Sequence, residues 1–382
     1  MSALRSILEQ ARTQGVFSGA AWSVGTADTV LDRGWTGTRA RPVTPRPPAA
    51  GGAAPDGAAP GRPRERGAAA SGPHPLDGTD LWDLASVTKP VVGLAVTVLI
   101  DRGVLALTDT VGDHLPQYVG TPRAPLTVAQ LLTHTSGLPG GVPMYRDHPT
   151  RASLLAALGT LPAAPPGTRV VYSSQGFMLL GLIAEAASGT PLDTLVEETV
   201  CAPLGMSGTG FTPDAAGRAR AVATEDCPWR GRVVVGEVHD ENAVVLGGVC
   251  GHAGLFAPLD DMERLGASLA GGARTLMRPD TYALMTAPHT DGLGLRRCLA
   301  WQGLDPVGSP VGTAFGPDSY GHTGFTGTSL WVDPAAGLYA VLLTNRVHPT
   351  RAGEGIAAVR RAFHDSAHTA YAVRAAGTRP GR

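Results

Sequence analysis

Apolar residues recur along the chain with two different spacings, which predict where helices and strands lie. Residues 4–11 place their leucines, isoleucine and alanine on one face of a helix. Residues 19–25 and 29–35 are short runs joined by a turn, which is typical of two strands. Near the other end of the chain, residues 329–344 predict a hairpin around Pro-Ala-Ala-Gly. Residues 356–371 predict a closing helix.

Helical patterns dominate the middle of the chain. The predicted helices combine an apolar face with recognisable boundary residues: 128–133 after Thr127, 154–158, 177–186 before Gly189, 191–200 from Pro191, and 259–269. We therefore expect one sheet built from both chain ends. It would belong to an αβ domain of residues 1–104 and 245–372, and residues 105–244 would form an inserted, mainly helical domain.

Residues 42–75 differ sharply from the rest of the chain. Proline, glycine and alanine dominate this stretch, and almost none of its side chains could enter a core. Such a segment cannot offset its ordering entropy by burial. We interpret residues 42–75 as a flexible insertion in a surface loop.

Composition and charge exclude several classes of protein. The formal net charge is −1, and no basic stripe suggests a nucleic-acid partner. The longest apolar run, residues 90–100, is too short to span a bilayer, so no membrane partner is expected. Residues 1–10 lack the apolar core of a signal peptide, which predicts a cytoplasmic protein. The four cysteines have no Cys-x-x-Cys spacing, so reduced, buried thiols are expected.

A Ser-x-x-Lys tetrad, Ser86 to Lys89, leads directly into the most apolar helical stretch. Lysine and arginine together number 31, and Lys89 is the single lysine among them. An arginine would supply charge equally well, but a guanidinium stays protonated in proteins. Residues three apart lie on one helical face, so Lys89 can reach Ser86 and activate it as a nucleophile. The alternative is a helix cap followed by a solvated lysine, which fits poorly with the apolar surroundings.

Two weaker motifs follow. Tyr172-Ser173-Ser174 precedes a long helix, and a tyrosine can act as a base when a nearby cation such as Lys89 stabilises its phenolate. His322-Thr323-Gly324 precedes the predicted hairpin, and its glycine would let the backbone approach a ligand. Taken alone, each motif is more often structural: a buried tyrosine with one hydrogen bond, or a core or surface histidine.

Together, the order and spacing of the three motifs are similar to those of penicillin-recognising serine enzymes. The chain resembles the class C β-lactamase-like serine hydrolases, which include β-lactamases, D,D-peptidases and esterases. Residues 84–90, 127–139 and 321–327 carry the resemblance, which covers about residues 16–40 and 78–350. It implies an α+β fold of the β-lactamase/transpeptidase type. A five-stranded antiparallel sheet would be flanked by helices, with an inserted helical domain and the site in the cleft between them.

The resemblance also implies a role for individual residues. Ser86 would be the acylated nucleophile, with Lys89 and Tyr172 sharing its proton. The backbone N–H groups of Ser86 and Phe325 would form the oxyanion hole. The remaining substrate-binding positions would be Ser174, His322, Thr323 and Gly324.

Three positions depart from the family pattern. Trp82 stands where a smaller aromatic or an aliphatic residue is usual. Ser174 replaces the asparagine whose amide contacts β-lactams, and His322 stands where β-lactamases usually carry lysine. The last two departures argue against efficient β-lactam hydrolysis.

A metal-like stretch contains His239, Asp240, Glu241 and His252. Adjacent residues of an extended segment point in opposite directions, so few of these side chains could converge on one ion. The stretch also resembles a loop common in the same hydrolase family. We expect a wall of the site here, and no metal or other cofactor.

Three hypotheses follow for the function. The first is a serine acyl hydrolase acting through an acyl-enzyme, on small-molecule esters. The second is a β-lactamase or D-amino-acid peptidase acting on amides. The third is a non-catalytic binding module with the same fold, which the intact set of Ser86, Lys89 and Tyr172 argues against.

Overall fold

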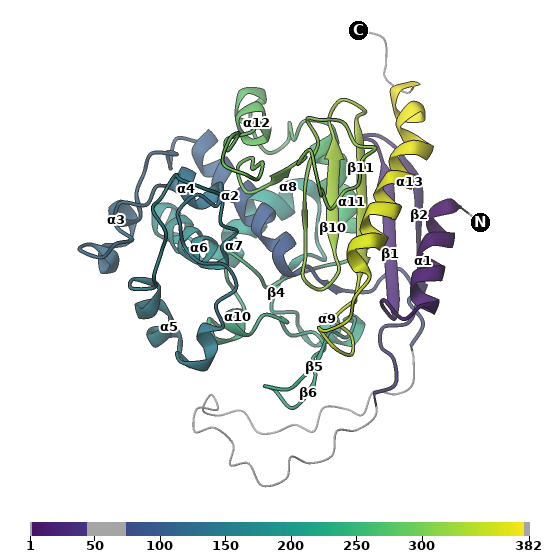
Figure 1. The fold of residues 1–382 in the computed structure, drawn as a ribbon, viewed down its shortest axis with the longest axis horizontal. Helices are drawn as coiled ribbons and strands as arrows, with labels where there is room; N and C mark the ends of the chain where they lie inside the picture. Colours follow the sequence, from purple (N-terminus) through teal and green to yellow (C-terminus); the bar gives the residue numbers. More distant parts are fainter. Residues whose placement is uncertain (1, 44–73, 378–382) are drawn as a thin grey trace.

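The largest sheet joins the two ends of the chain. The computed structural model describes residues 2–43 and 74–377. Six antiparallel strands lie in the order β2-β1-β11-β10-β9-β8 (Figure 1). Their bounds are β1 Gly19–Gly25, β2 Val30–Gly37, β8 Gln302–Gly303, β9 Tyr320–Thr323, β10 Ser329–Asp333 and β11 Leu338–Thr344. The predicted five-stranded antiparallel sheet is confirmed, with the two-residue β8 as an additional strand at one edge.

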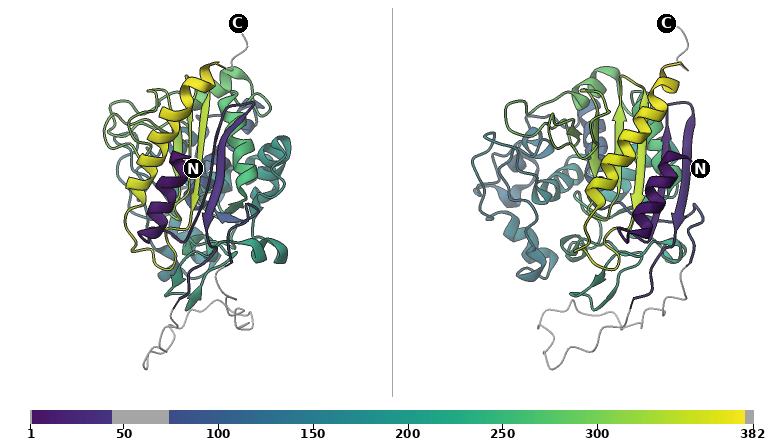
Figure 2. Two further views of the ribbon diagram at one scale, coloured as in Figure 1. Left: turned by 90° about the vertical axis from the view of Figure 1, so that its right-hand side faces the viewer. Right: turned by 45° about the vertical axis from the view of Figure 1, so that its right-hand side comes forward.

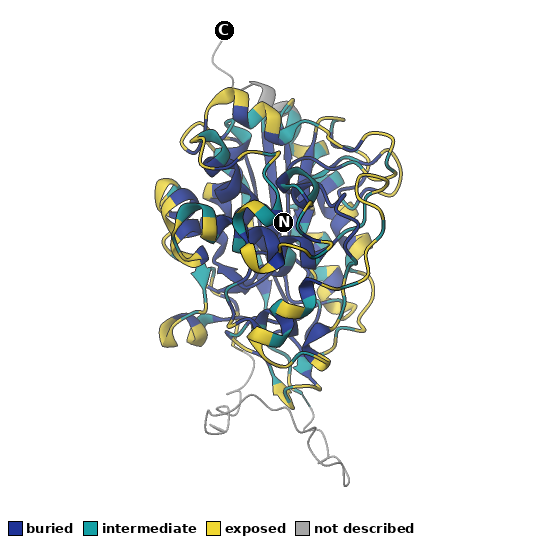
Figure 3. Ribbon diagram, turned by 90° about the vertical axis from the view of Figure 1, so that its left-hand side faces the viewer, coloured by how far each residue is buried: buried dark blue, intermediate teal, exposed yellow. Residues whose placement is uncertain are grey.

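Both faces of the sheet are covered. Helices α1 (Ala3–Thr13) and α13 (Ile356–Gly377) lie on one face, and α11 (Leu259–Ala270) packs against β1 and β11 from the other (Figure 2). Strands β1, β10 and β11 are therefore buried along their whole length. Figure 3 shows buried residues in the interior and exposed ones at the periphery. Successive residues of β11 alternate between two apolar clusters, because strand side chains point to opposite faces.

The remaining helices form a mainly helical body around α2. They are α2 Thr88–Asp101, α3 Val111–His114, α4 Val128–Leu132, α5 Arg151–Leu158, α6 Ser174–Ser188, α7 Leu192–Val196, α8 Ala202–Leu204, α9 Ala215–Arg220, α10 Glu241–Val245 and α12 Pro279–Thr286. Helix α2 is apolar all round because it is enclosed, with contacts to α6, α7 and α12.

Helix boundaries follow the local sequence. Thr127 caps α4 in a capping box with Gln130, in which each side chain accepts from the other residue's backbone N–H. Helix α6 ends at Gly189, whose φ of +69° is the left-handed conformation that glycine adopts without a Cβ penalty. Both boundaries confirm the sequence predictions.

Two small sheets lie below the main one in Figure 1. Strands β3 (Trp82–Asp83), β7 (Leu255–Ala257) and β4 (Gly210–Phe211) pair antiparallel, and β5 (Asp226–Cys227) pairs with β6 (Arg232–Val233). Strand β3 leads directly into the turn that carries Ser86 and then into α2. It thereby ties the start of α2 to β7.

Two of the sequence predictions are not tested by the described structure. The predicted insertion, residues 42–75, lies almost entirely outside the described residues. The division into two domains stays a prediction. Within residues 2–43 and 74–377, no helix has the length and apolar character needed to cross a membrane.

Close packing of α11 on the sheet depends on Gly266. A Cβ at this position would lie 2.6 Å from the Tyr339 ring on β11. Gly266→Ala should lower the free energy of unfolding by about 1–2 kcal/mol, because overpacking outweighs the better helix propensity of alanine. Urea unfolding measures this change. Gly210→Ala is the matched control, since a Cβ on Gly210 would meet no atom within 4 Å; an equal loss in both variants would contradict the packing argument.

Candidate active site

Ser86 lies in a tight turn between β3 and α2. The turn is the 3₁₀ segment η1, Ala85–Val87. Ala85 has a φ of +47°, a left-handed conformation that residues with a Cβ rarely adopt. The Ala85 N–H donates to Asp83 Oδ1 at 2.7 Å, and the His239 N–H donates to Asp83 Oδ2 at 2.7 Å. The buried Asp83 side chain therefore holds the strained backbone that precedes Ser86.

The loop between β9 and β10 is bound to the same turn. Thr326 Oγ1 donates to the Asp83 carbonyl at 2.8 Å, and Thr328 Oγ1 donates to the Leu84 carbonyl at 2.9 Å. Gly324 approaches so closely that a Cβ would lie 2.5 Å from the Leu84 carbonyl oxygen. These contacts explain why the third motif needs its glycine, and they fix this loop beside Ser86.

Lys89 is fully buried, and its amine lies beside the Ser86 hydroxyl. The Nζ atom donates to Ser86 Oγ at 3.0 Å and to the His252 carbonyl at 3.2 Å. The predicted pair is thus within hydrogen-bond distance, as i and i+3 positions at the start of a helix allow. The catalytic roles of Ser86 and Lys89 stay a proposal.

Tyr172 joins this pair from the segment before α6. Lys89 Nζ lies 4.8 Å from the centre of the Tyr172 ring, a cation–π contact. The tyrosine also contacts the His134 ring, with 4.7 Å between centroids. The Val171 N–H donates to the His134 carbonyl at 2.8 Å, which holds the preceding backbone in place. Within the described residues, no hydrogen bond joins the Tyr172 hydroxyl to Ser86 or Lys89.

His322 and His134 are neutral histidines in a positively charged surrounding. Burial, together with the charges of Lys89 and Arg297, lowers the pKa of His322 to about 3. The His322 Nδ1–H donates to the Thr323 carbonyl at 2.8 Å, which leaves Nε2 with its lone pair. Burial and the same two charges hold the pKa of His134 well below its ordinary value.

Two backbone N–H groups are available as an oxyanion hole. Within the described part of the chain, neither the Ser86 nor the Phe325 N–H has a hydrogen-bond acceptor. The Phe325 ring is about half exposed, stacks on His239 with centroids 5.7 Å apart, and lies under the Arg346 guanidinium. Arg346 Nε also donates to the Phe325 carbonyl at 2.7 Å, so both side chain and backbone of this residue are held.

The two serines of the middle motif, Ser173 and Ser174, have different surroundings. Ser173 is the N-cap of α6: its hydroxyl accepts from the Gly176 N–H at 3.1 Å and donates to the Pro139 carbonyl at 2.7 Å. Ser174, the first residue of α6, is partly exposed, as is Thr323 on β9. The assignment of Ser174 and Thr323 to substrate binding stays a proposal.

Sequence reasoning missed Arg297, the most unusual charge near the site. Its side chain is buried, its Nε has no hydrogen-bond partner among the described residues, and its charge acts on both His134 and His322. The Tyr172 phenol in turn acts on the pKa of Arg297, which burial lowers. No sequence signal could have separated this arginine from the many others in the chain.

The metal-like stretch separates into different pairs. His239 Nε2 contacts Glu225 Oε2 at 3.1 Å, whereas His252 Nε2 contacts Asp240 Oδ1 at 2.9 Å. The expectation that these four side chains do not share one ion agrees with this geometry. The stretch does form a wall of the site, because the His252 carbonyl accepts from Lys89.

A different set of buried groups could hold a metal by distance alone. Glu225, Cys227 and Glu241 have ligand atoms within 4.8 Å of one another. The guanidinium of Arg351 pairs with both carboxylates, and Arg230 lies 3.6 Å from the Cys227 sulfur. These cations already neutralise the two carboxylates, so the cluster is an ion-pair network behind His239.

Comparison with known proteins identifies the family. A family model described as Beta-lactamase matches residues 4–364. The chain belongs to the beta-lactamase family. A relative from Escherichia coli strain K12, named "Putative D-alanyl-D-alanine carboxypeptidase", is 31% identical over 306 residues, covering 70% of this chain and 69% of that protein. Together these findings make this beta-lactamase family member a serine hydrolase, as its three motifs predicted.

Solved structures support the same fold. EstCE1, described as a hydrolase with promiscuous acyltransferase activity, aligns with a TM-score of 0.72 at 22% identity, covering 96% of this chain and 97% of that one. Unliganded simvastatin synthase LovD from Aspergillus terreus, in its selenomethionyl form, aligns with a TM-score of 0.73 at 19% identity, covering 96% and 98%. At these identities the likeness establishes the fold.

The contact between Lys89 and Ser86 generates a prediction. Lys89→Arg should lower kcat for p-nitrophenyl acetate by at least about 10³, nearly as far as Lys89→Ala, because a guanidinium cannot accept the serine proton. Steady-state kinetics measure the loss, and circular dichroism establishes that the variants fold. The reverse exchange at an exposed site, Arg102→Lys, should change nothing. If folded Lys89→Arg keeps a tenth of the turnover, Tyr172 becomes the sole candidate base.

Proposed function

We propose that this serine hydrolase acts on small carboxylic esters through a covalent acyl-enzyme at Ser86. The observation that carries the proposal is the position of Lys89 Nζ between Ser86 Oγ at 3.0 Å and the His252 carbonyl at 3.2 Å. To take the serine proton, Lys89 must act in its deprotonated form, in which the amine would donate one N–H to the carbonyl and offer its lone pair to the serine hydroxyl. That arrangement suits removal of the serine proton as the oxygen attacks a carbonyl carbon.

The remaining groups supply the rest of acyl transfer. Tyr172, whose ring contacts Lys89 Nζ, would relay the proton from the lysine to the departing alcohol oxygen through its hydroxyl. The N–H groups of Ser86 and Phe325 would bind the oxyanion, because both lack another acceptor in the described chain. Attack of water on the acyl-enzyme would then use the same groups in reverse.

The preference for esters rests on two positions. Ser174 has a short hydroxyl where an asparagine would offer an amide to the amide side chain of a β-lactam. His322 is neutral at physiological pH, since burial and nearby positive charge lower its pKa to about 3, so it cannot supply the positive charge of the lysine that β-lactamases carry. Ester turnover therefore depends less on these lost contacts than β-lactam turnover does.

Covalent labelling tests the proposal directly. A fluorophosphonate should label Ser86 and no other serine, and Ser86→Ala should abolish labelling and lower kcat by about 10⁶, as loss of a nucleophile that acts with its base does. Peptide mass spectrometry locates the adduct. Ser136→Ala is the matched control, because Ser136 lies in residues 127–139, which carry part of the family resemblance, and should be dispensable for labelling. An adduct on Ser136 or Ser174 would overturn the assignment.

Arg297 supports a second candidate, a carboxypeptidase that acts on peptides with a free terminal carboxylate. Among the described residues this buried guanidinium forms no ion pair, although the charge of Asp305 acts on it, and its Nε lacks an acceptor that a substrate carboxylate would supply. The Escherichia coli relative carries the name of such an enzyme. Arg297 lies close enough to His134, His322 and Tyr172 for their charges to interact.

A charged peptide substrate and an uncharged ester distinguish the carboxypeptidase candidate from the esterase candidate. Arg297→Gln should lower kcat/KM for an acyl-D-alanyl-D-alanine peptide by at least about 100-fold, in line with the loss of a charged hydrogen bond. The variant should leave turnover of an uncharged ester within about threefold. Parallel kinetics on both substrates give the comparison, with Arg297→Lys as the charge-retaining control. Equal losses on both substrates would assign Arg297 to the support of Tyr172 and remove the carboxypeptidase candidate.

A further inference from the structure

Directly behind Lys89 lies a second chain of reactive groups that the hydrolase mechanism does not use. Cys250 Sγ lies 3.0 Å from His252 Nδ1, and His252 Nε2 lies 2.9 Å from Asp240 Oδ1. The three side chains form a thiol–imidazole–carboxylate series, the arrangement that activates a cysteine in other protein sites. Only the backbone carbonyl of His252 takes part in the contact with Lys89.

The side chains of this series are aligned so that a ring nitrogen of His252 faces the sulfur of Cys250. Burial lowers the pKa of His252, but the charges of Cys250 and Asp240 outweigh burial and raise it to about 10. His252 is therefore an imidazolium at neutral pH, and both ring N–H groups donate: one to Asp240 and one to the sulfur of Cys250. An imidazolium N–H directed at sulfur stabilises the thiolate, the nucleophilic form of cysteine.

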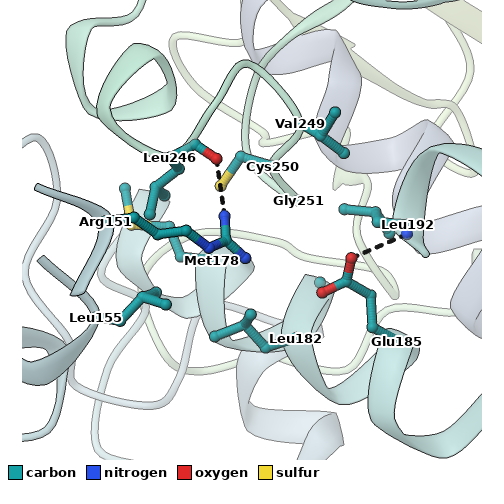
Figure 4. Close-up of a pocket in the computed structure, with 11 residues that line it drawn as sticks. Arg151, Leu155, Met178, Leu182, Glu185, Leu192, Leu246, Val249, Cys250 and Gly251 are labelled. Atoms are coloured by element: carbon teal, nitrogen blue, oxygen red, sulfur yellow. Dashed lines mark hydrogen bonds between the residues drawn. The ribbon is translucent and has the colours of Figure 1, made fainter. Parts of the chain in front are cut away.

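The thiol of Cys250 faces a pocket. Cys250 and Gly251 line it together with Arg151, Met178 and Glu185 (Figure 4). The guanidinium of Arg151 extends across the pocket and donates to the Leu246 carbonyl at 2.8 Å. The pocket has a volume of about 20 Å³, which accommodates one or two water-sized molecules and excludes a bulky disulfide such as oxidised glutathione.

Within the described chain, the other three cysteines neither contact a histidine through sulfur nor line this pocket, although Arg230 lies 3.6 Å from the Cys227 sulfur. Cys250 is 6% exposed, whereas Cys201, Cys227 and Cys298 are each 2% exposed or less. Burial raises the pKa of both Cys201 and Cys298 to about 12, so they remain thiols at neutral pH. The chain therefore contains internal controls for any chemistry at Cys250.

A change at Cys250 would reach Lys89 through a short, tightly packed turn. Gly251 follows Cys250 and lies so close to α6 that a Cβ would be 2.1 Å from the Phe177 carbonyl oxygen. The next residue, His252, supplies the carbonyl that accepts from Lys89. Because Cys250 Sγ is a hydrogen-bond partner of the His252 ring, an oxygen added to the sulfur would change that contact next to the carbonyl that positions Lys89.

We propose that Cys250 is a peroxide-sensitive modification site whose oxidation lowers hydrolase activity reversibly. The thiolate attacks one peroxide oxygen, the S–O bond forms and the O–O bond breaks. The departing hydroxide takes the proton of the His252 imidazolium and leaves as water. Sulfur loses two electrons to the peroxide and becomes a sulfenic acid, which two equivalents of a thiol reduce back to the thiol with release of a disulfide and water.

Two independent readouts test the proposal on the full-length, reduced protein. Hydrogen peroxide is added to the folded protein and then removed with catalase, portions are unfolded in urea that contains dimedone, which traps sulfenic acid, and mass spectrometry locates the adducts. Cys250 should be labelled at least about tenfold faster than Cys201, Cys227 or Cys298. His252→Gln, which keeps the backbone carbonyl, should slow labelling by at least about tenfold. Preferential labelling of another cysteine would overturn the proposal.

The second readout is activity, which rests on the proposed function. In samples oxidised without dimedone, p-nitrophenyl acetate turnover should fall with the same rate constant as the sulfenic acid forms, and dithiothreitol should restore it. Cys250→Ala should keep basal turnover, and peroxide should no longer lower it. Peroxide should still lower the turnover of Cys298→Ala. If peroxide inactivated Cys250→Ala as fast as the wild type, or if the oxidised wild type kept full turnover, the coupling between Cys250 oxidation and hydrolase activity would be refuted. Absence of basal turnover in the reduced wild type would instead refute the esterase assignment, while dimedone labelling still decides the modification site.

Discussion

The geometry of the site depends on two backbone carbonyls, those of Asp83 and Leu84. Each accepts a threonine hydroxyl from the loop between β9 and β10, at 2.8 and 2.9 Å. These bonds hold the turn before Ser86 in a conformation that Ala85, at φ +47°, would not adopt alone. They also hold the loop that carries Phe325 against this turn. One pair of hydrogen bonds thus fixes both the turn of the proposed nucleophile and the loop that carries a group proposed to stabilise the oxyanion.

The buried amine of Lys89 requires hydrogen-bond acceptors and compensating charge from the groups around it. Removing a charged Lys89 from water is costly unless hydrogen bonds and opposite charge compensate. The carbonyl of His252 supplies one acceptor, the Ser86 hydroxyl another, and the charge of Lys89 helps to hold the pKa of Asp240 low. Burial, together with the charges of Lys89 and Arg297, keeps His134 and His322 neutral, so both rings line the site as hydrogen-bonding groups and not as cations.

Contacts between residues that are close in the sequence could be predicted, whereas contacts between residues far apart in the sequence could not. Ser86 and Lys89 meet because they are one helical turn apart, and the β10–β11 hairpin follows from two alternating runs around one turn. The contact of Lys89 with the His252 carbonyl joins residues 163 positions apart, and no local pattern encodes it. Arg297 was missed for a second reason: arginine is so common in this chain that one functional copy carries no signal.

The order of strands in the main sheet has a consequence for synthesis of the chain. Strand β1, Gly19–Gly25, leaves the ribosome early, yet its partner β11 is Leu338–Thr344. Throughout most of translation, one edge of β1 is therefore without its final neighbour, and an unpaired apolar edge invites association with other chains. The loop that holds the Ser86 turn also emerges late. A nascent chain consequently contains the proposed nucleophile long before the loop that holds its turn, so the geometry of the site forms only when the sheet is complete.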